Sequence, residues 1–305
     1  MAAGDVFSVP PIPDLHYVDT GMYETTEYGT VYILDAERPA IVDTGTGATY
    51  ERVLDAMAEV GIAPEDLEVI ALTHIHLDHA GGAGYLVEEC PNATVAVYEP
   101  GARHLRDPER LVAGTKAAVG TEWQFYADPK PLADDRIREF AAGEAIDLGD
   151  RELLAHAAHG HAPHQVVFED PAAGVVFTAD AAGIYVPASD DVRPTSPPST
   201  FDLEGVIADA HMLDSLDPQV LCYGHFGAAR ADGRLREYVN VITEWVGRVE
   251  DKRAELGDDE AVEEYFAETA PLTPSWGERR SRAEGRMNAK GVLRYLDERD
   301  AAATE

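Results

Sequence analysis

The sequence predicts an α+β fold in which two β-sheets pack face to face and helices cover their outer surfaces. A series of short apolar segments is followed by helical segments, and a second such series is followed by further helices. Strands grouped in this way favour two packed sheets over a doubly wound sheet, in which strands and helices alternate throughout. The chain has 305 residues and is 45% hydrophobic, which is enough for one substantial core.

The first series begins as a predicted β-meander, because polar and glycine turns separate its apolar segments. Strands are expected at 15–18, 31–34, 40–43, 68–72 and 94–98. Helices are expected at 50–60, 84–89 and 99–119. In the first of these helices, Val53, Met57 and Val60 have helical spacing, and Gly61 is a natural helix end.

The second series follows an aromatic and proline-containing segment at 121–135, which we expect to form an irregular loop. We slightly favour a packed cover over the core for this loop, with a substrate-pocket wall as the alternative. Strands are then expected at 137–140, 145–148, 152–158, 165–168 and 175–178. Residues 187–200 are rich in proline, serine and aspartate and are predicted to be a surface loop.

Helical patterns dominate the chain after Gly227. Helices are expected at 232–256, 260–270 and 284–299. We therefore expect a catalytic domain over residues 1–229 and a helical C-terminal extension over 230–305 that packs on it. The sequence leaves open whether this extension forms a homodimer contact or only caps the core.

The segment with the clearest chemistry lies directly after the predicted strand at 68–72. It places His74, His76, Asp78 and His79 within six residues. Loops at the carboxyl ends of strands are where open α/β sheets place their sites. Mixed nitrogen and oxygen ligands suit zinc, manganese or iron. Because the whole chain has only 11 histidines, we disfavour the alternative of solvated loop residues.

Three later segments carry ligand-type side chains at the ends of short apolar strands. Residues 156–164 hold four histidines, Asp180 follows the strand at 175–178, and His225 follows the apolar segment at 220–222. Taken alone, Asp180 would be interpreted as a turn carboxylate and His225 as a buried core histidine. Together with residues 74–79 they favour a metal centre, because ligands occur in clusters.

The charge balance is strongly acidic, with 57 Asp and Glu residues against 24 Lys and Arg residues and a net charge of −33. Only four of the basic residues are lysines, and the acids are spread along the chain. Such a surface is typical of a halophilic protein, because high salt screens dense like charge. The charge argues against nucleic-acid and anionic-membrane partners, both of which require a basic surface.

Cys90 and Cys222 are the only cysteines, and neither has metal-site spacing. We expect buried free thiols. No apolar stretch approaches the ~20 residues of a membrane span, and the N-terminal residues lack the features of a signal peptide. The expected location is the cytoplasm.

The pattern His74-x-His76-x-Asp78-His79, followed by His161, Asp180 and His225, resembles the metallo-β-lactamase fold superfamily. The matching motifs extend over about residues 15–230 and include the segment 41–45. Segments 78–86, 161–164 and 181–185 are most similar to a prokaryotic subgroup described as glyoxalase II-like hydrolases.

This resemblance implies an αββα four-layer sandwich with two divalent metal ions, zinc first and manganese or iron as alternatives. It assigns His74, His76 and His161 to one ion, and Asp78, His79 and His225 to the other. It makes Asp180 the bridge between the two ions and Asp43 a group that steadies the ligand loops.

Two positions depart from the family pattern: His159 precedes Gly160 where proline is common, and Ala179 precedes Asp180 where glycine is common. His159 and His164 leave some choice for the third ligand, but His161 alone matches the motif.

The resemblance also implies hydrolysis of a small acyl substrate by a hydroxide that bridges the two ions. A thioester is the first candidate, with an ester or a lactone as alternatives. Asp78 and Tyr185 are the candidate catalytic residues. Tyr185 could donate a hydrogen bond to the substrate, although an aromatic ring packed at the pocket edge is an equal alternative.

Two other functions stay open at this point. A mononuclear iron centre with the same ligands would support a persulfide dioxygenase. A non-catalytic metal-binding module ranks lowest, because seven intact ligands exceed what stability requires. The acidic charge opposes a nuclease.

Overall fold

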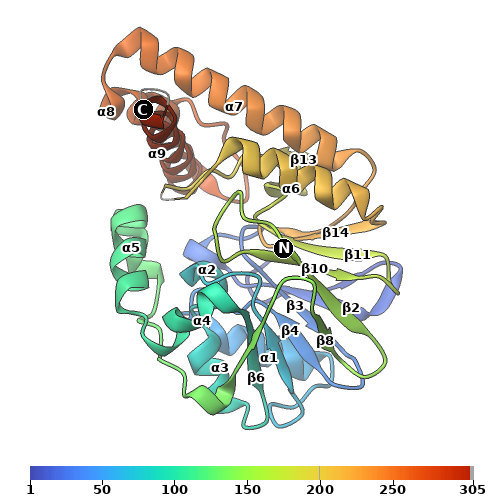
Figure 1. Ribbon diagram of the computed structural model, residues 1–305. Coiled ribbons are helices and arrows are strands. Elements are labelled where there is room, and N and C mark those ends of the chain that lie inside the picture. Colours follow the sequence, from blue (N-terminus) through green and yellow to red (C-terminus); the bar gives the residue numbers. More distant parts are fainter. Residues whose placement is uncertain (199, 303–305) are drawn as a thin grey trace.

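Two β-sheets lie face to face between helical layers in the computed structural model, which describes residues 1–198 and 200–302 (Figure 1). The first sheet has seven strands in sequence order, namely β1 (Val6–Val9), β2 (Ile12–Asp19), β3 (Thr30–Leu34), β4 (Ala40–Val42), β5 (Val69–Ala71), β6 (Thr94–Tyr98) and β7 (Ile137–Phe140). Strands β1 to β4 are antiparallel, and β4 to β7 are parallel. The first half is therefore the predicted meander.

The second sheet has six strands. Their order is β15 (Gly227–Arg230), β14 (Val220–Tyr223), β11 (Val175–Ala179), β10 (Val166–Asp170), β9 (Glu152–Ala157) and β8 (Ala145–Asp147). Only β11 and β14 pair in parallel. Because β10 is antiparallel to both β9 and β11, the strands β9, β11 and β14 all run in the same direction.

Helices make the crossovers that parallel strands require. On the first sheet these are α1 (Tyr50–Glu59), α2 (Leu77–Ala80), α3 (Ala83–Glu89), α4 (Glu99–Arg106) and α5 (Glu109–Val119). On the second sheet, α6 (Leu203–Ser215) connects toward β14. The C-terminal helices are α7 (Arg234–Leu256), α8 (Asp259–Glu268) and α9 (Gly277–Ala302).

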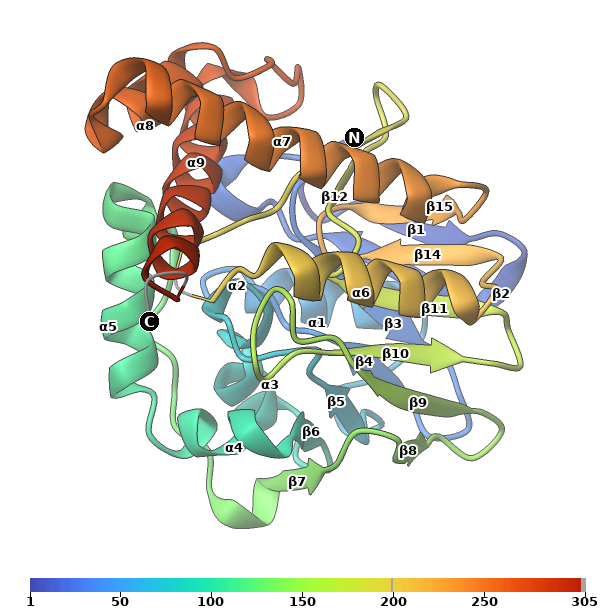
Figure 2. The ribbon, with the colours of Figure 1, turned by 45° about the horizontal axis from the view of Figure 1, so that its top comes forward.

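Three apolar clusters hold the four layers together. The cluster between the sheets includes Leu15, Tyr32, Phe140, Phe168 and Phe177, none more than 2% exposed. The cluster outside the first sheet joins it to α1, α3 and α4. The cluster outside the second sheet joins it to α6, α7 and α9, and Figure 2 shows α6 and α7 lying across that sheet. The predicted αββα sandwich is confirmed.

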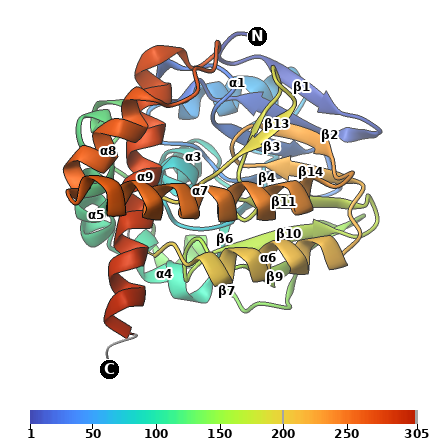
Figure 3. The same cartoon turned by 90° about the horizontal axis from the view of Figure 1, so that it is seen from above.

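The C-terminal helices pack on the rest of the chain in two ways. Apolar residues of α7 and α9 share one cluster with α6 and the second sheet. Figure 3 shows α9 crossing α7, and its other side faces the end of α5, where the Lys290 ammonium lies 3.5 Å from the Ala117 carbonyl oxygen. The boundary between a catalytic domain and an extension at residue 230 stays a prediction.

Several elements were not predicted from the sequence. These are β1, α6, β15 and the hairpin of β12 (Ile184–Val186) with β13 (Asp191–Arg193), part of which occupies the expected surface loop. The helical segments expected over about 99–119 are α4 and α5, which Asp107 and Pro108 separate. Within the described residues, no helix is both long and apolar enough to cross a membrane.

Candidate metal centre

The predicted ligands gather at one edge of the sandwich because their strands end there. His74 and His76 follow β5, and Asp78 and His79 lie in the short helix α2. The other three follow strands of the second sheet that run in one direction: His161 comes after β9, Asp180 after β11 and His225 after β14. Loops from both sheets therefore meet above the core between them.

The first group of donors consists of His74, His76 and His161. The His76 Nδ1 atom lies 3.1 Å from His74 Nε2 and 3.0 Å from His161 Nε2. Zn–N bonds of about 2.05 Å in a tetrahedral site separate two ligand nitrogens by about 3.3 Å. The spacing of these nitrogens thus suits one shared ion.

The second group consists of Asp78, His79 and His225. His79 Nε2 lies 3.3 Å from His225 Nε2, and Asp78 Oδ2 lies 3.6 Å from His225 Nε2. Asp180 stands between the two groups. Its Oδ2 is 3.3 Å from His161 Nε2, and its Oδ1 is 3.4 Å from His79 Nε2. One carboxylate oxygen therefore faces each group.

Hydrogen bonds outside the centre fix which nitrogen each histidine presents. The Nδ1 atom of His79 donates to Asp43 Oδ2 at 2.9 Å, and the Nδ1 atom of His225 donates to the Tyr28 carbonyl oxygen at 3.0 Å. Both rings consequently direct Nε2 into the centre, which is the atom that a neutral ring would offer to a metal ion. Asp43 Oδ1 also accepts from the Thr73 backbone amide at 2.9 Å, which ties this carboxylate to the ligand loop.

The donor set fits divalent ions. The ring nitrogens of His74, His76 and His161 converge, and Asp180 Oδ1 is buried with no hydrogen-bond partner among the described residues. Burial and neighbouring imidazoles lower the pKa of His74 and of His76, and burial lowers the pKa of His161 to about 3. These histidines are thus in the neutral form that binds metals.

The carboxylates favour a cation at the second group. Burial opposes a charge on His79, but Asp180 and Asp43 outweigh it and raise the pKa of His79 well above its ordinary value. The nearby histidines hold the pKa of Asp180 well below its usual range despite burial. Positive charge is therefore stabilised here, whether a proton or a metal ion carries it.

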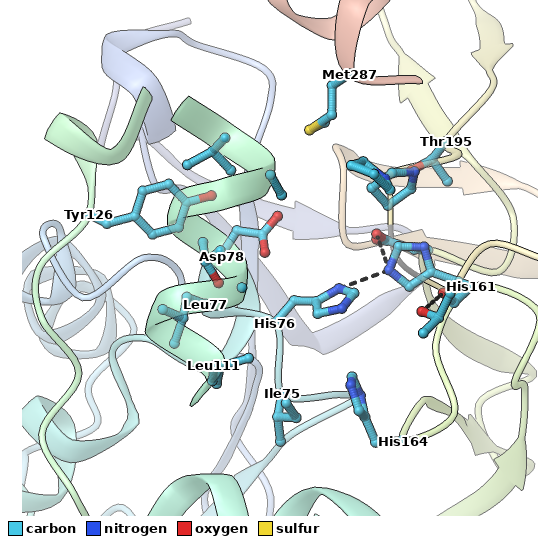
Figure 4. A pocket seen from close by; sticks show the side chains of 18 of the residues that line it. Ile75, His76, Leu77, Asp78, Leu111, Tyr126, His161, His164, Thr195 and Met287 are labelled. Carbon is cyan, nitrogen blue, oxygen red and sulfur yellow. Dashed lines mark hydrogen bonds and ion pairs between the residues drawn. The ribbon is translucent and has the colours of Figure 1, made fainter. Parts of the chain in front are cut away.

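A pocket of about 420 Å³ opens above the donors. Its floor includes His76, Asp78 and His161, which Figure 4 shows facing the cavity. The rest of the lining includes Tyr23 and Tyr28 before β3, residues of α4, α5 and α9, Tyr126, His164, Ile184 of β12, and residues 195, 197, 198 and 200. This volume is in the ordinary range for small-molecule sites.

The other predicted or alternative residues are placed as follows. His159 is exposed and stacks on Tyr98, away from the donors. His164 lines the pocket, with its ring centroid 5.2 Å from that of His76, but it is outside the donor groups. His161 is thus the histidine of this loop that joins a donor group.

The predicted substrate contact of Tyr185 does not fit the structure. Its hydroxyl donates to Asp190 Oδ1 at 2.8 Å, and its ring stacks on Tyr223 in the outer core. Because side chains alternate along a strand, Ile184 of β12 lines the pocket and Tyr185 does not. The alternative of a packed aromatic ring describes this residue better.

The two departures from the family pattern are accommodated locally. Ala179 has φ +47°, a left-handed conformation that costs a non-glycine residue roughly 1–2 kcal/mol. Gly160 is needed for close packing, since a Cβ there would lie 2.1 Å from the Val206 backbone nitrogen at the start of α6. His159 takes the usual proline position without disturbing that approach.

Two of the pocket tyrosines and one glutamate were missed from the sequence. Tyr23, Tyr28, Tyr126 and Glu284 all line the cavity. Tyr126 belongs to the segment 121–135, so one residue of that loop forms a pocket wall while Trp123 stacks behind it. No local pattern marks Tyr23, Tyr28 or Glu284, because each depends on distant chain segments meeting here.

Comparison with known proteins agrees with this geometry. The family model described as metallo-beta-lactamase superfamily matches residues 25–225. The metallo-beta-lactamase fold-containing protein ST1585 of Sulfurisphaera tokodaii is 28% identical over 224 residues, covering 71% of this chain and 80% of its own. The acyl-coenzyme A thioesterase MBLAC2 of Gallus gallus is 24% identical over 262 residues, covering 80% and 89%.

Solved structures show the same fold. The crystal structure of ST1585 from Sulfolobus tokodaii matches with a TM-score of 0.70 at 22% identity, covering 92% of this chain and 98% of that one. The metallo-beta-lactamase family protein TTHA1429 from Thermus thermophilus matches with a TM-score of 0.61 at 23% identity, covering 97% and 94%.

Proposed function

Because this chain belongs to the metallo-β-lactamase superfamily, we propose that it is a hydrolase that cleaves the thioester of a small acyl group. The observation that carries the proposal is the pair of donor groups sharing Asp180 at the floor of a pocket. The acyl-coenzyme A thioesterase among its relatives favours a thioester over an ester or a lactone.

The two donor groups would hold two divalent ions, for which we propose zinc. Such ions lower the pKa of a water molecule toward ~7 and polarise an acyl oxygen. Asp78 is the candidate proton acceptor, because it lines the pocket and its side chain is 22% exposed, while Oδ2 faces His225.

A tyrosine pair supplies a candidate hydrogen-bond donor to the substrate. The hydroxyls of Tyr23 and Tyr126 hydrogen-bond to each other, and both residues line the pocket. One hydroxyl proton is sufficient for the bond between the two tyrosines. The second hydroxyl proton is therefore available to donate to an acyl oxygen of the substrate. Burial raises the pKa of Tyr126 well above its ordinary value, which keeps this hydroxyl protonated at neutral pH.

The apolar part of the pocket would hold the acyl group. Leu111 and Val119 of α5 face the cavity from one side, and Met287 contributes from α9. A cavity of about 420 Å³ accommodates a short acyl chain more readily than a macromolecule.

The first test is metal content by elemental analysis, paired with thioester hydrolysis by the purified chain. The expected result is about two zinc ions per chain with turnover. His74→Ala should lose metal and activity, whereas His159→Ala should keep both, because His159 is exposed and outside the donor groups.

Other outcomes would reject the proposal. About one iron per chain with oxygen uptake on a persulfide would indicate a dioxygenase. Full metal content without turnover on any thioester, ester or lactone would indicate a metal-binding module. Full metal content and activity in His74→Ala would refute the ligand assignment.

A further inference from the structure

A cationic cluster lies at one side of the pocket, away from the donor groups. Arg103 near the end of α4 and Arg110 in the first turn of α5 both line the cavity. His104 and His164 line it as well, and Figure 4 shows the His164 ring directed toward His76. The cluster thus extends from beside the metal centre to solvent, where both arginines are exposed.

Neither arginine has a carboxylate partner among the described residues. Arg106 on the same helix pairs with Asp134 and Glu139, both at 2.6 Å. Arg103 Nε donates only to His104 Nε2 at 3.1 Å, and Arg110 makes no ion pair or hydrogen bond within the described chain. Of the 20 arginines, 13 form an ion pair within the described residues, and of the remaining seven only Arg103 and Arg110 line this pocket.

The histidines of the cluster stay neutral, and no hydrogen bond joins them within the described residues. Burial lowers the pKa of His104, and Arg103 and Arg110 lower it further. Burial lowers the pKa of His164 to about 2, with contributions from other imidazoles and from Arg103. The buried Nδ1 atom of His164 has no hydrogen-bond partner among the described residues. The charge of the cluster therefore resides on the two guanidinium groups.

We propose that Arg103 and Arg110 bind an anionic group, phosphate or carboxylate, in the thiol half of the substrate. This inference rests on the proposed thioester hydrolysis. The scissile bond must reach Asp78 at the floor, while the arginines lie at the exposed mouth. An anion there belongs to the half of the substrate that extends toward solvent. Guanidinium groups recognise phosphate and carboxylate oxygens by paired hydrogen bonds.

The overall charge strengthens the argument. A surface with a net charge of −33 repels an anionic substrate, so a local positive patch at the pocket is needed to attract it. A neutral thioester would need no such patch. The cluster therefore favours a substrate whose thiol half carries a negative charge. Phosphate and carboxylate both supply the oxygen atoms that guanidinium groups bind.

The test uses three thioesters with the same acyl group and different thiols. Coenzyme A carries phosphates, glutathione carries carboxylates, and N-acetylcysteamine is neutral. The variants are Arg103→Gln, Arg110→Gln and their double, with Arg236→Gln as a control. Arg236 is also exposed and without an ion pair in the described chain, but it is on α7 and does not line the pocket.

The metal-loaded wild type should prefer one anionic thioester to the neutral one, mainly through KM. The double variant should lose at least about tenfold in kcat/KM on that thioester, because each lost charge-assisted bond weakens binding by roughly tenfold. Its loss on the neutral thioester should be much smaller, and Arg236→Gln should resemble the wild type. Equal losses on all three substrates, or no preference in the wild type, would overturn the proposal.

A binding measurement separates this proposal from the proposed reaction. Adenosine 3′,5′-bisphosphate and S-methylglutathione carry the two kinds of anion and have no free thiol to ligate metal. If no thioester is cleaved but one of these binds to the wild type and not to the double variant, the anion site holds and the thioesterase proposal fails. If thioesters are cleaved but neither anion binds, the anion-site proposal is refuted and the thioesterase proposal stands.

Discussion

The hydroxyl of Tyr28 donates a hydrogen bond to Glu284 Oε2 at 2.5 Å, across 256 positions of sequence. The backbone carbonyl of the same tyrosine accepts from Nδ1 of His225, a predicted metal ligand. A single residue therefore connects the C-terminal helix α9 to the metal centre. Glu284 also accepts from Arg280 at 2.6 Å, and Arg280 is only 2% exposed.

Replacing Arg280 should destabilise the protein strongly. Its guanidinium also lies 3.3 Å from Glu122, but Arg279 binds that carboxylate at 2.8 Å, so Arg280→Ala leaves the buried Glu284 carboxylate without its cation. Breaking a buried ion pair from one side costs roughly 3–5 kcal/mol. Denaturant unfolding should show this loss. Arg282→Ala, in the same helix as Arg280, removes an exposed pair with Glu264 of α8 and should change stability by less than about 1 kcal/mol. Similar losses in both variants would contradict this role.

Asp43→Asn should weaken metal binding without unfolding the chain. Asp43 has φ +64°, and asparagine tolerates this left-handed conformation, so the substitution mainly removes the charge that orients His79. Loss of such a supporting group typically costs about 10–100-fold in metal affinity. Competition with a zinc chelator should detect the change. Asp35→Asn, at an exposed position, is the control, and equal affinity in the two variants would refute the assignment.

Gly224→Ala should displace the second donor group. A Cβ at residue 224 would lie 2.8 Å from His79 Cε1, and His79 cannot move freely because it is bonded to Asp43. We expect a lower metal content per chain and a stability loss of roughly 1–3 kcal/mol from overpacking. The control is Gly247→Ala in α7, where an added Cβ meets no atom within 4 Å. That variant should gain about 0.5–1 kcal/mol, and normal metal content in Gly224→Ala would count against the prediction.

The layers and the donor groups could be predicted because their signals are local. Short apolar segments between polar turns mark the strands, and four donors stand within six residues at 74–79. Tyr28, Arg280 and Glu284 carry no local signal, because their contacts join residues far apart in sequence. The sequence also does not say which face of β12 is directed to the pocket, so it could not decide between the two alternatives for Tyr185. Segment α6 was missed because its apolar residues do not form a clear helical stripe.

Tyr126→Phe should slow catalysis more than it weakens binding. The ring keeps its stacking on Trp123 at 5.3 Å, but the variant loses the hydroxyl that pairs with Tyr23 and faces the pocket. Removing one donor to a developing oxyanion costs about a hundredfold in kcat. Steady-state kinetics on the preferred thioester should show this with a nearly constant KM. Tyr265→Phe on the exposed side of α8 is the control, and an unchanged kcat in Tyr126→Phe would exclude it as the donor.

The acidic surface predicts that salt stabilises the fold. Salt weakens favourable ion pairs as well as repulsion, but 24 basic residues cannot neutralise 57 acids, so repulsion is the larger effect. Raising KCl from about 0.1 M to about 2 M shortens the screening length from about 10 Å to below 3 Å. The melting temperature should therefore rise over this range, measured with and without bound metal.

Sucrose at matched osmolality is the control for this salt effect, because excluded solutes stabilise folded proteins without screening charge. We expect a larger rise in KCl than in sucrose, since only the salt reduces repulsion among the acidic side chains. A melting temperature that does not change with KCl, or that rises equally in sucrose, would show that the net charge of −33 does not limit stability. The acidic surface would then need an explanation other than adaptation to high salt.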